Sequence, residues 1–347
     1  MKKFTLPLPR SRWLLLLLTL LLIGPALLLS ACTSREDAKP CDCPSIGGPA
    51  KWSGLFEDPV SGPDLSYHQP SYNPTNGQQL VYRRGSRADL DQRVLPALTV
   101  GLWVGGATNG QQNPLLRGYD VLFAPNYGPN GWVAFCRGGQ VWKAKANGDS
   151  LQRLTGGNSG HFVPQWSPDG TRLVCHRDNT SPGGPILIVD RTGRPVRSLL
   201  IENTKYALAW SPDGNSLLLE YDPTRKDMGL ATYNLRTNQL ETVVTIPKAP
   251  NSYGDVYGAA WLPDGKSIVW CCNLGLYQTN LTTRRTVRLR SGCQGRQYEN
   301  PAVSPDGRQI AVERTDRRVS DDGYSMHTET NIWTLDLDGS NERKVSF

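Results

Sequence analysis

The sequence of 347 residues lacks the residue patterns that mark the common classes of enzyme and metal protein. It contains only four His, and it has no Gly-x-Ser-x-Gly nucleophile turn, no phosphate-binding Gly-rich loop, no Gly-x-Gly-x-x-Gly and no His-Glu-x-x-His. Charged residues make up 20% of the chain and hydrophobic residues 38%, which excludes a disordered acidic chain and a coiled coil. We therefore expect no catalytic residue, no cofactor and no metal ion.

Glycine and proline are abundant instead, with 35 and 26 residues. Helix interiors tolerate neither residue, so this content indicates many turns between short strands. The chain has 10 Trp and 13 Tyr against 6 Phe, and these broad rings also favour strands. An all-helical fold is excluded.

Residues 1–31 have the features of a bacterial export signal. Four basic residues precede an apolar run from Trp13 to Leu29, and small residues follow it. Leu29-Ser30-Ala31-Cys32 resembles a lipobox, which predicts removal of residues 1–31 and attachment of a lipid to Cys32. The alternative is an uncleaved membrane anchor, because 17 apolar residues can just span a bilayer.

The residue after the lipid-bearing cysteine is Thr33 rather than Asp. By resemblance to Gram-negative sorting patterns, this predicts the outer membrane, with the protein facing the periplasm or the exterior. Residues 32–50 are polar and rich in turn formers, so we interpret them as a flexible tether.

The formal net charge of +7 does not indicate a nucleic-acid partner. Residues 1–31 hold four of the basic residues and no acid, so the rest of the chain has 34 basic and 31 acidic residues, a balance of +3. The basic excess therefore belongs mostly to the export signal.

Six related segments recur along the rest of the chain and predict its fold. Each has an aromatic or apolar residue followed by a Pro-containing turn, and their first residues are Tyr72, Tyr127, Trp166, Trp210, Trp261 and Val303. Their starts lie 55, 39, 44, 51 and 42 residues apart, close to the ~40–50 residues of a propeller blade. The form Trp-Ser-Pro-Asp-Gly suits a tight turn, since Pro presets φ and Gly ends the turn.

A β-rich apolar run follows each turn, then a third such run, a Gly or Asn turn and a more polar fourth segment. This order predicts an all-β fold for residues 51–347: a six-bladed β-propeller of four-stranded antiparallel blades. We expect the first residue of each repeat to pack between neighbouring blades. The repeats resemble those of the TolB-like propeller family over residues 67–347, but the chain lacks the α/β domain that precedes the propeller in TolB.

The residues four and five positions before each repeat predict a binding surface. In a propeller the innermost strands line a central channel, and these positions lie where those strands begin. Every blade has an aromatic residue there, and the candidate binding residues are Tyr67, His68, Phe123, His161, Phe162, Lys205, Tyr206, Tyr257, Tyr298 and Glu299. Rings interleaved with charges suit a protein, peptide or glycan. The alternative is that these rings only fill the contacts between blades.

Seven cysteines remain apart from Cys32. Disulfides are expected in an exported protein, but an odd number leaves at least one cysteine without a partner in the chain. Cys136 and Cys175 occupy equivalent places in adjacent blades, too far apart for a bridge. We predict that Cys272, or its neighbour Cys271, pairs with Cys293.

These observations predict a non-catalytic, lipid-anchored envelope protein that acts as a monomer and docks a protein, peptide or glycan on its channel face. The alternative is a carbohydrate-active enzyme, because the repeats also resemble polysaccharide-lyase propellers with His-bound metal at the channel. Only His68 and His161 lie at the predicted rim, so a three-His site is unavailable. A passive spacer would leave the aromatic rim without a role.

Overall fold

The computed structural model describes residues 65–86, 101–108, 111–118, 123–177, 184–224, 226–247, 256–272, 275–293, 295–319 and 326–345. All of them belong to one compact unit. The predicted export signal, Cys32 and the tether lie outside the described residues. No helix in the described part of the chain is long and apolar enough to cross a membrane.

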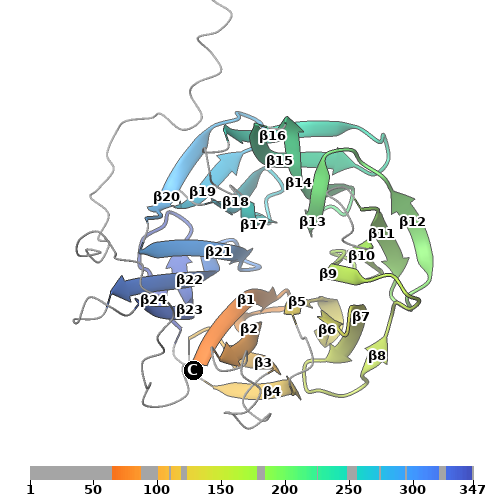
Figure 1. The fold of residues 1–347 in the computed structure, drawn as a ribbon, viewed down its shortest axis with the longest axis horizontal. Helices are drawn as coiled ribbons and strands as arrows, with labels where there is room; N and C mark the ends of the chain where they lie inside the picture. Colours follow the sequence, from red (N-terminus) through yellow and green to blue (C-terminus); the bar gives the residue numbers. More distant parts are fainter. Residues whose placement is uncertain are drawn as a thin grey trace, which may run out of the picture. The chain divides into compact units, whose positions relative to one another are not determined.

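The described residues form six four-stranded antiparallel sheets arranged in a ring, so the predicted six-bladed β-propeller is confirmed (Figure 1). Each sheet is one blade and uses four strands that are consecutive in the chain.

Blades 1 to 3 comprise β1 (Leu65–Asn73), β2 (Asn76–Ser86), β3 (Gly101–Gly106), β4 (Gln112–Arg117); β5 (Phe123–Tyr127), β6 (Trp132–Arg137), β7 (Gln140–Lys145), β8 (Gln152–Arg153); and β9 (His161–Trp166), β10 (Arg172–Arg177), β11 (Ile186–Asp190), β12 (Pro195–Leu199). Blades 4 to 6 comprise β13 (Thr204–Trp210), β14 (Ser216–Thr224), β15 (Asp227–Asn234), β16 (Leu240–Pro247); β17 (Val256–Trp261), β18 (Ser267–Cys272), β19 (Gly275–Asn280), β20 (Thr286–Ser291); and β21 (Arg296–Val303), β22 (Gln309–Val319), β23 (Met326–Asp336), β24 (Arg343–Lys344). The short 3₁₀ helix η2 (Pro129–Gly131) forms the first turn of blade 2.

The repeated turn joins the first two strands of each blade, as its chemistry predicts. In blade 3 the Gly170 amide donates to the Ser167 carbonyl at 2.9 Å, and Gly170 has a left-handed φ of 66° that favours glycine. The Ser167 hydroxyl donates to the Asp169 carboxylate at 2.6 Å, and the Thr171 amide donates to the same carboxylate at 3.0 Å. These donors, the hydroxyl first, lower the pKa of Asp169.

The core of the propeller lies between the blades. Six clusters of buried apolar side chains each join two neighbouring blades, and together they complete the circle. The first residue of every repeat packs into one of these clusters; among them, Trp210 lies between blades 3 and 4 and Tyr72 between blades 6 and 1. The predicted packing of these residues between blades is therefore confirmed.

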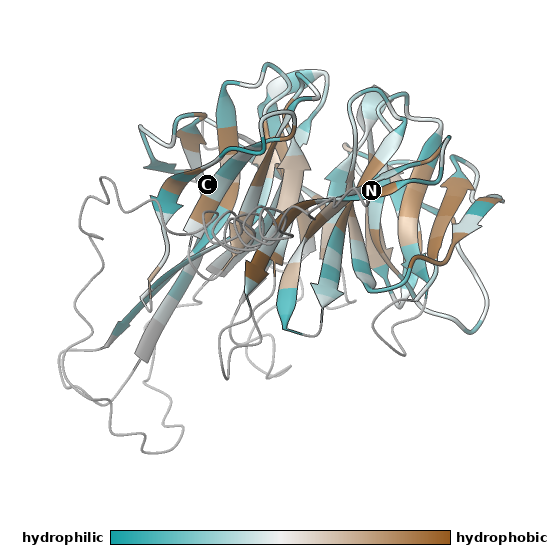
Figure 2. Ribbon diagram, turned by 90° about the horizontal axis from the view of Figure 1, so that it is seen from above, coloured by the Kyte–Doolittle hydropathy of each residue, from teal (hydrophilic) through white to brown (hydrophobic). Residues whose placement is uncertain are grey.

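The second strand of each blade supplies both of its neighbouring clusters. In β14, Leu217 and Leu219 face blade 3, whereas Leu218 faces blade 5, and all three are fully buried. Because successive side chains of a strand point to opposite faces, a strand covered on both sides needs a continuous apolar run. Figure 2 shows these hydrophobic stretches along the strands, with hydrophilic residues at the turns.

Ring closure between blades 1 and 6 depends on side chains. Tyr72 and Leu80 of blade 1 pack against Ala311 and Ile332 of blade 6. In many repeat proteins the ends need special capping because a terminal unit otherwise exposes its apolar face. Here the two terminal blades cover each other.

Candidate functional site in the central channel

The first strand of every blade lines a cavity of about 1140 Å³. These six strands lie innermost in the ring (Figure 1). Binding pockets for small ligands typically have volumes of ~300–1,000 Å³, so this channel can hold a sizeable ligand or a side-chain-bearing segment. Of the ten predicted site residues, the structure places Phe123, Phe162, Lys205, Tyr206, Tyr257 and Glu299 on the cavity wall.

The other four predicted residues do not line the cavity. Tyr298 is only 1% exposed and His161 only 4%, so both are wrong as rim residues. Tyr67 packs beside Tyr82, with 5.9 Å between ring centroids, and His68 contacts Glu313. Strand alternation explains His161 and Tyr298, because their chain neighbours Phe162 and Glu299 face the channel instead.

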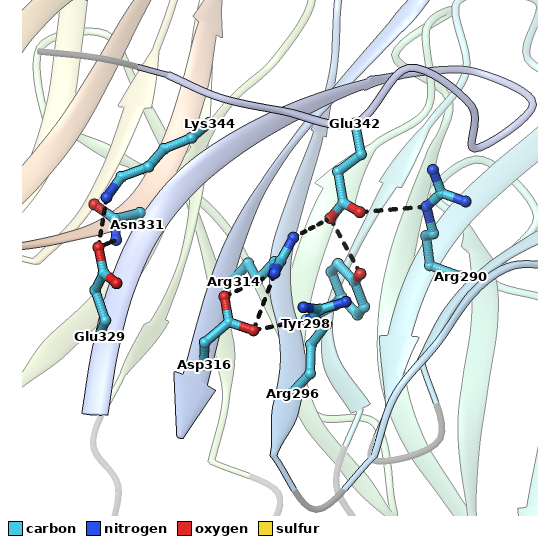
Figure 3. A network of polar contacts seen from close by, with 9 residues as sticks. All are labelled: Arg290, Arg296, Tyr298, Arg314, Asp316, Glu329, Asn331, Glu342 and Lys344. Atoms are coloured by element: carbon cyan, nitrogen blue, oxygen red, sulfur yellow. Dashed lines mark hydrogen bonds and ion pairs between the residues drawn. The ribbon is translucent and has the colours of Figure 1, made fainter. Parts of the chain in front are cut away.

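Tyr298 has a structural role at the interface of blades 5 and 6. Its hydroxyl donates to Glu342 at 3.1 Å, and the same carboxylate accepts from Arg314 at 3.1 Å. Arg314 also contacts Asp316 at 2.9 Å. Figure 3 shows this network, in which the Tyr298 hydroxyl points toward Glu342 of blade 6.

A left-handed residue bends the innermost strand in five of the six blades. It stands three positions before the repeat, and the five residues are Gln69 (φ 53°), Ala124 (51°), Val163 (53°), Gly258 (101°) and Asn300 (50°). The pairing register with the second strand shifts at each of these places, so each is a β-bulge. Bulges re-aim side chains and are common next to functional sites.

The bulges expose backbone amides that bond across blades. The Ala124 amide of blade 2 donates to the Gln69 side chain of blade 1 at 2.7 Å. The Gln69 amide in turn donates to Glu313 of blade 6 at 3.0 Å. These bonds fix the relative positions of neighbouring blades at the channel wall.

Two carboxylates face each other where blade 6 meets the channel. Glu299 of β21 lies directly opposite Glu313 of β22 in the antiparallel register. Glu313 accepts from His68 Nδ1 at 2.7 Å, from the Gln69 amide at 3.0 Å and from the Asn300 amide group at 3.0 Å. Burial first, and then the Glu313 charge, raise the pKa of Glu299 to about 7.

The wall formed by blades 3 and 4 carries a different set of polar groups. Lys205 Nζ lies 3.1 Å from Glu220 and 3.7 Å from Asp222. His176 is 4% exposed, and its ring meets Tyr206 edge-on with 5.0 Å between centroids. Burial lowers the pKa of His176 to about 4, so its imidazole is neutral at physiological pH.

The solved structures that are similar to this fold include TolB propellers. The fold is TolB-like. A putative TolB from Agrobacterium tumefaciens superposes with a TM-score of 0.55 at 17% identity, covering 68% of this chain and 84% of that one. TolB from Acinetobacter baumannii gives a TM-score of 0.55 at 15% identity, covering 81% of this chain and 63% of that one.

An oligogalacturonate lyase in complex with manganese also shares the fold, with a TM-score of 0.50 and 13% identity over 79% of this chain and 91% of that one. The sequence matches no model of a known protein family and is not similar to a curated protein. Identities this low establish the propeller architecture alone. Among the residues described, no group of three or more His, Cys, Asp or Glu could hold a metal ion.

Sequence reasoning missed several polar residues of the channel, although they recur at one fixed position in the repeats. The sixth residue after each turn glycine is Arg83, Arg137, His176, Glu220, Cys271 or Glu313. Five of these six interrupt an otherwise apolar second strand with a polar group. His176 and Glu220 line the cavity, and Glu313 lies against Glu299. Comparing equivalent second-strand positions would therefore have found them.

The predicted disulfide between Cys272 and Cys293 is wrong. Cys271 and Cys272 are both buried and neither forms a disulfide, as is also true of Cys136 and Cys175, whereas Cys293 is disulfide-bonded. Cys272 ends β18, where it pairs with Val256 and Gly275 inside the core between blades 4 and 5. Packing of the strand thus commits this side chain to the core, which the sequence position alone did not reveal.

Proposed function

We propose that the protein is a non-catalytic, lipid-anchored binding protein of the bacterial cell envelope that receives a segment of a partner protein or peptide in its channel. The observation that carries this proposal is the cavity of about 1140 Å³ lined by Phe123, Phe162, Tyr206 and Tyr257. Phe123 and Phe162 stack with 6.0 Å between centroids. Such rings offer large apolar area at low conformational cost, which suits recognition of a partner.

The polar groups of the channel favour a polypeptide as the partner. The wall combines Lys205, Glu220 and Glu299 with the amide side chains of Asn126 and Gln165. A polypeptide carries apolar side chains, both signs of charge and backbone donors and acceptors, so its chemistry matches a wall of this mixed kind. Tyr206 is 41% exposed and therefore accessible to a segment that enters the cavity.

The envelope location is supported by residues 1–32, whose basic start, apolar run and Leu29-Ser30-Ala31-Cys32 suit export and lipid attachment. Labelling of cells with a palmitate analogue should mark the wild-type protein and not a Cys32→Ala variant. A single acyl-modified residue followed by a polar tether would leave the channel free to meet envelope partners.

A site-specific crosslinking experiment tests the channel as the docking site. A photo-reactive amino acid replaces Tyr206 in the channel or Val287 on the outer strand of blade 5, both exposed positions. Irradiation in intact cells should give a discrete adduct from position 206 alone. The adduct should weaken when Phe162 and Tyr257 are also changed to Ala. The same adducts from both positions, or no effect of the ring substitutions, would refute docking in the channel.

A further inference from the structure

We propose that the channel binds a cationic group of its ligand, a primary ammonium or a guanidinium, at Glu299, which releases its proton to solvent as the cation arrives. The inference rests on the proposed function, because it names the chemistry of the segment that the channel would receive. Glu299 lines the cavity and makes no hydrogen bond or ion pair with any side chain in the described ranges.

The two facing carboxylates have different surroundings, and this difference makes Glu299 the one that can bind a cation of the ligand. Both oxygens of Glu313 are occupied by the donors of His68, Gln69 and Asn300. Glu299 lies directly opposite Glu313 on the neighbouring strand. Two carboxylates placed directly opposite destabilise each other when both are charged, so the second charge needs a cation from outside the fold.

The other charged and titratable groups around Glu299 do not supply that cation. From β1, His68 donates to Glu313. From β22, Arg317 is exposed and bonds to Gln297 at 3.3 Å. From β18, Cys271 is fully buried, and burial raises the pKa of its thiol well above the usual value. The cavity is the remaining side from which a cation can reach the carboxylate.

A second group in the same cavity also points to a polar ligand. His176 lines the cavity, is more than nine-tenths buried, and its Nε2 atom has no hydrogen-bond partner. A buried polar atom left unpaired costs roughly 1–3 kcal/mol, so native structures rarely retain one without a reason. His176 therefore adds a polar side chain with an unsatisfied atom to the cavity wall.

The proton balance of the binding step is simple. The protonated Glu299 meets a ligand R–NH₃⁺, the carboxyl O–H bond breaks, and the proton passes to the buffer. The product is the ion pair between the Glu299 carboxylate and R–NH₃⁺. Because burial and Glu313 raise the pKa of Glu299 to about 7, cation binding near neutral pH should release up to about half a proton per site.

Three matched probes test the inference on the purified wild-type protein. They are 4-phenylbutylamine, the neutral 4-phenylbutanol and the anionic 4-phenylbutanoate, which share one ring and chain. Calorimetry at pH 7 should show at least tenfold tighter binding of the amine than of the alcohol. Repeating the titration in phosphate and in Tris, whose ionisation enthalpies differ, measures the protons released. At pH 5 the preference for the amine should shrink, because a larger fraction of Glu299 is protonated than at pH 7.

The Glu299→Gln variant should lose both the preference for the amine and the proton release. Glu241→Gln is the matched control, since Glu241 is an exposed carboxylate on the outer strand β16. Circular dichroism of both variants confirms that they fold. If Glu299→Gln fails to fold, the comparison of pH 5 with pH 7 on the wild-type protein still decides the question.

Equal affinity for the three probes, tighter binding of the carboxylate, or no binding of the amine up to about 10 mM would overturn the cation site. These outcomes leave docking in the channel intact if crosslinking from position 206 persists. Loss of that crosslink with retained preference for the amine would instead remove the proposed function and keep the cation site.

Discussion

At the scale of single residues, Glu299 and Glu313 show how surroundings separate two identical side chains. They face each other across β21 and β22, yet Glu313 accepts three hydrogen bonds and Glu299 accepts none within the described chain. Burial and the charge of Glu313 disfavour the charged form of Glu299. The two residues should therefore respond oppositely to substitution.

Replacing Glu299 with Gln should stabilise the fold at high pH. The folded-state pKa of Glu299 is raised from 4.5 to about 7, so the native protein loses stability as the pH rises from about 4.5 to 7, while the unfolded state releases this proton. Gln carries no such charge. The variant should gain on the order of 2 kcal/mol at pH 8 and nothing at pH 4, measured by urea unfolding.

The control for this measurement is Glu241→Gln, which removes a carboxylate that is exposed and lies far from the channel wall, on β16. Its stability relative to the wild-type protein should not change with pH over the same range. If the free energies of unfolding of wild type and Glu299→Gln changed with pH in parallel, the charge on Glu299 would not destabilise the native protein.

At this scale, six of the ten residues that the sequence singled out lie on the cavity wall. Periodicity identified where each innermost strand begins, and Phe162, Tyr206, Tyr257 and Glu299 do line the cavity. It failed for Tyr298, because the side of the strand depends on register, and a shift of one residue turns a side chain from channel to core.

At the scale of elements, the turn chemistry predicted the strand order of all six blades. Pro, Asp and Gly at fixed places specify the local turn, and the apolar run that follows must be a strand buried on both faces. The left-handed bulge three positions before the repeat in five of the six blades was not predicted. Gln69, Ala124 and Val163 are unrelated side chains at one left-handed position, so the position is set by tertiary contacts rather than by local preference.

Val163 provides the test of strain at the bulge. Its φ of 53° is unusual for a β-branched residue, and left-handed backbone costs an L-residue roughly 1–2 kcal/mol. Changing Val163 to Gly removes this strain but adds freedom to the unfolded chain, so the unfolding free energy should change by less than about 1 kcal/mol.

The matched variant is Val174→Gly, in the adjacent strand β10, where Val174 is fully buried between blades 3 and 4. This variant loses packing without any relief of strain. Its free energy of unfolding, measured in urea, should fall by about 3 kcal/mol or more. Equal losses for the two Val→Gly variants would mean that the bulge is unstrained or that Val163 packs more tightly than its half-buried position indicates.

At the scale of the whole molecule, the described parts of blades 1 and 6 meet through contacts that each involve a side chain. Every blade uses its own four consecutive strands, so no described strand is shared between the first and last blades. The joint consists of the apolar cluster around Tyr72 and Ile332 and of the Glu313 contacts to His68 and Gln69. Loss of the joint would turn a closed ring into an open stack whose terminal blades can separate.

Replacing Glu313 with Ala should therefore loosen the ring at this joint. The change leaves the partly buried donors of His68, Gln69 and Asn300 without their acceptor. After relief of the repulsion with Glu299, this should lower the free energy of unfolding by about 2 kcal/mol. Hydrogen exchange followed by mass spectrometry should show amides of β1 and β21 exchanging roughly 30-fold faster. Amides of β9 and β10, opposite the joint, should change little, and Glu241→Gln should leave both regions at wild-type rates. Uniform acceleration across all blades would mean instead that the ring unfolds as one unit and that Glu313 is not a local closure residue.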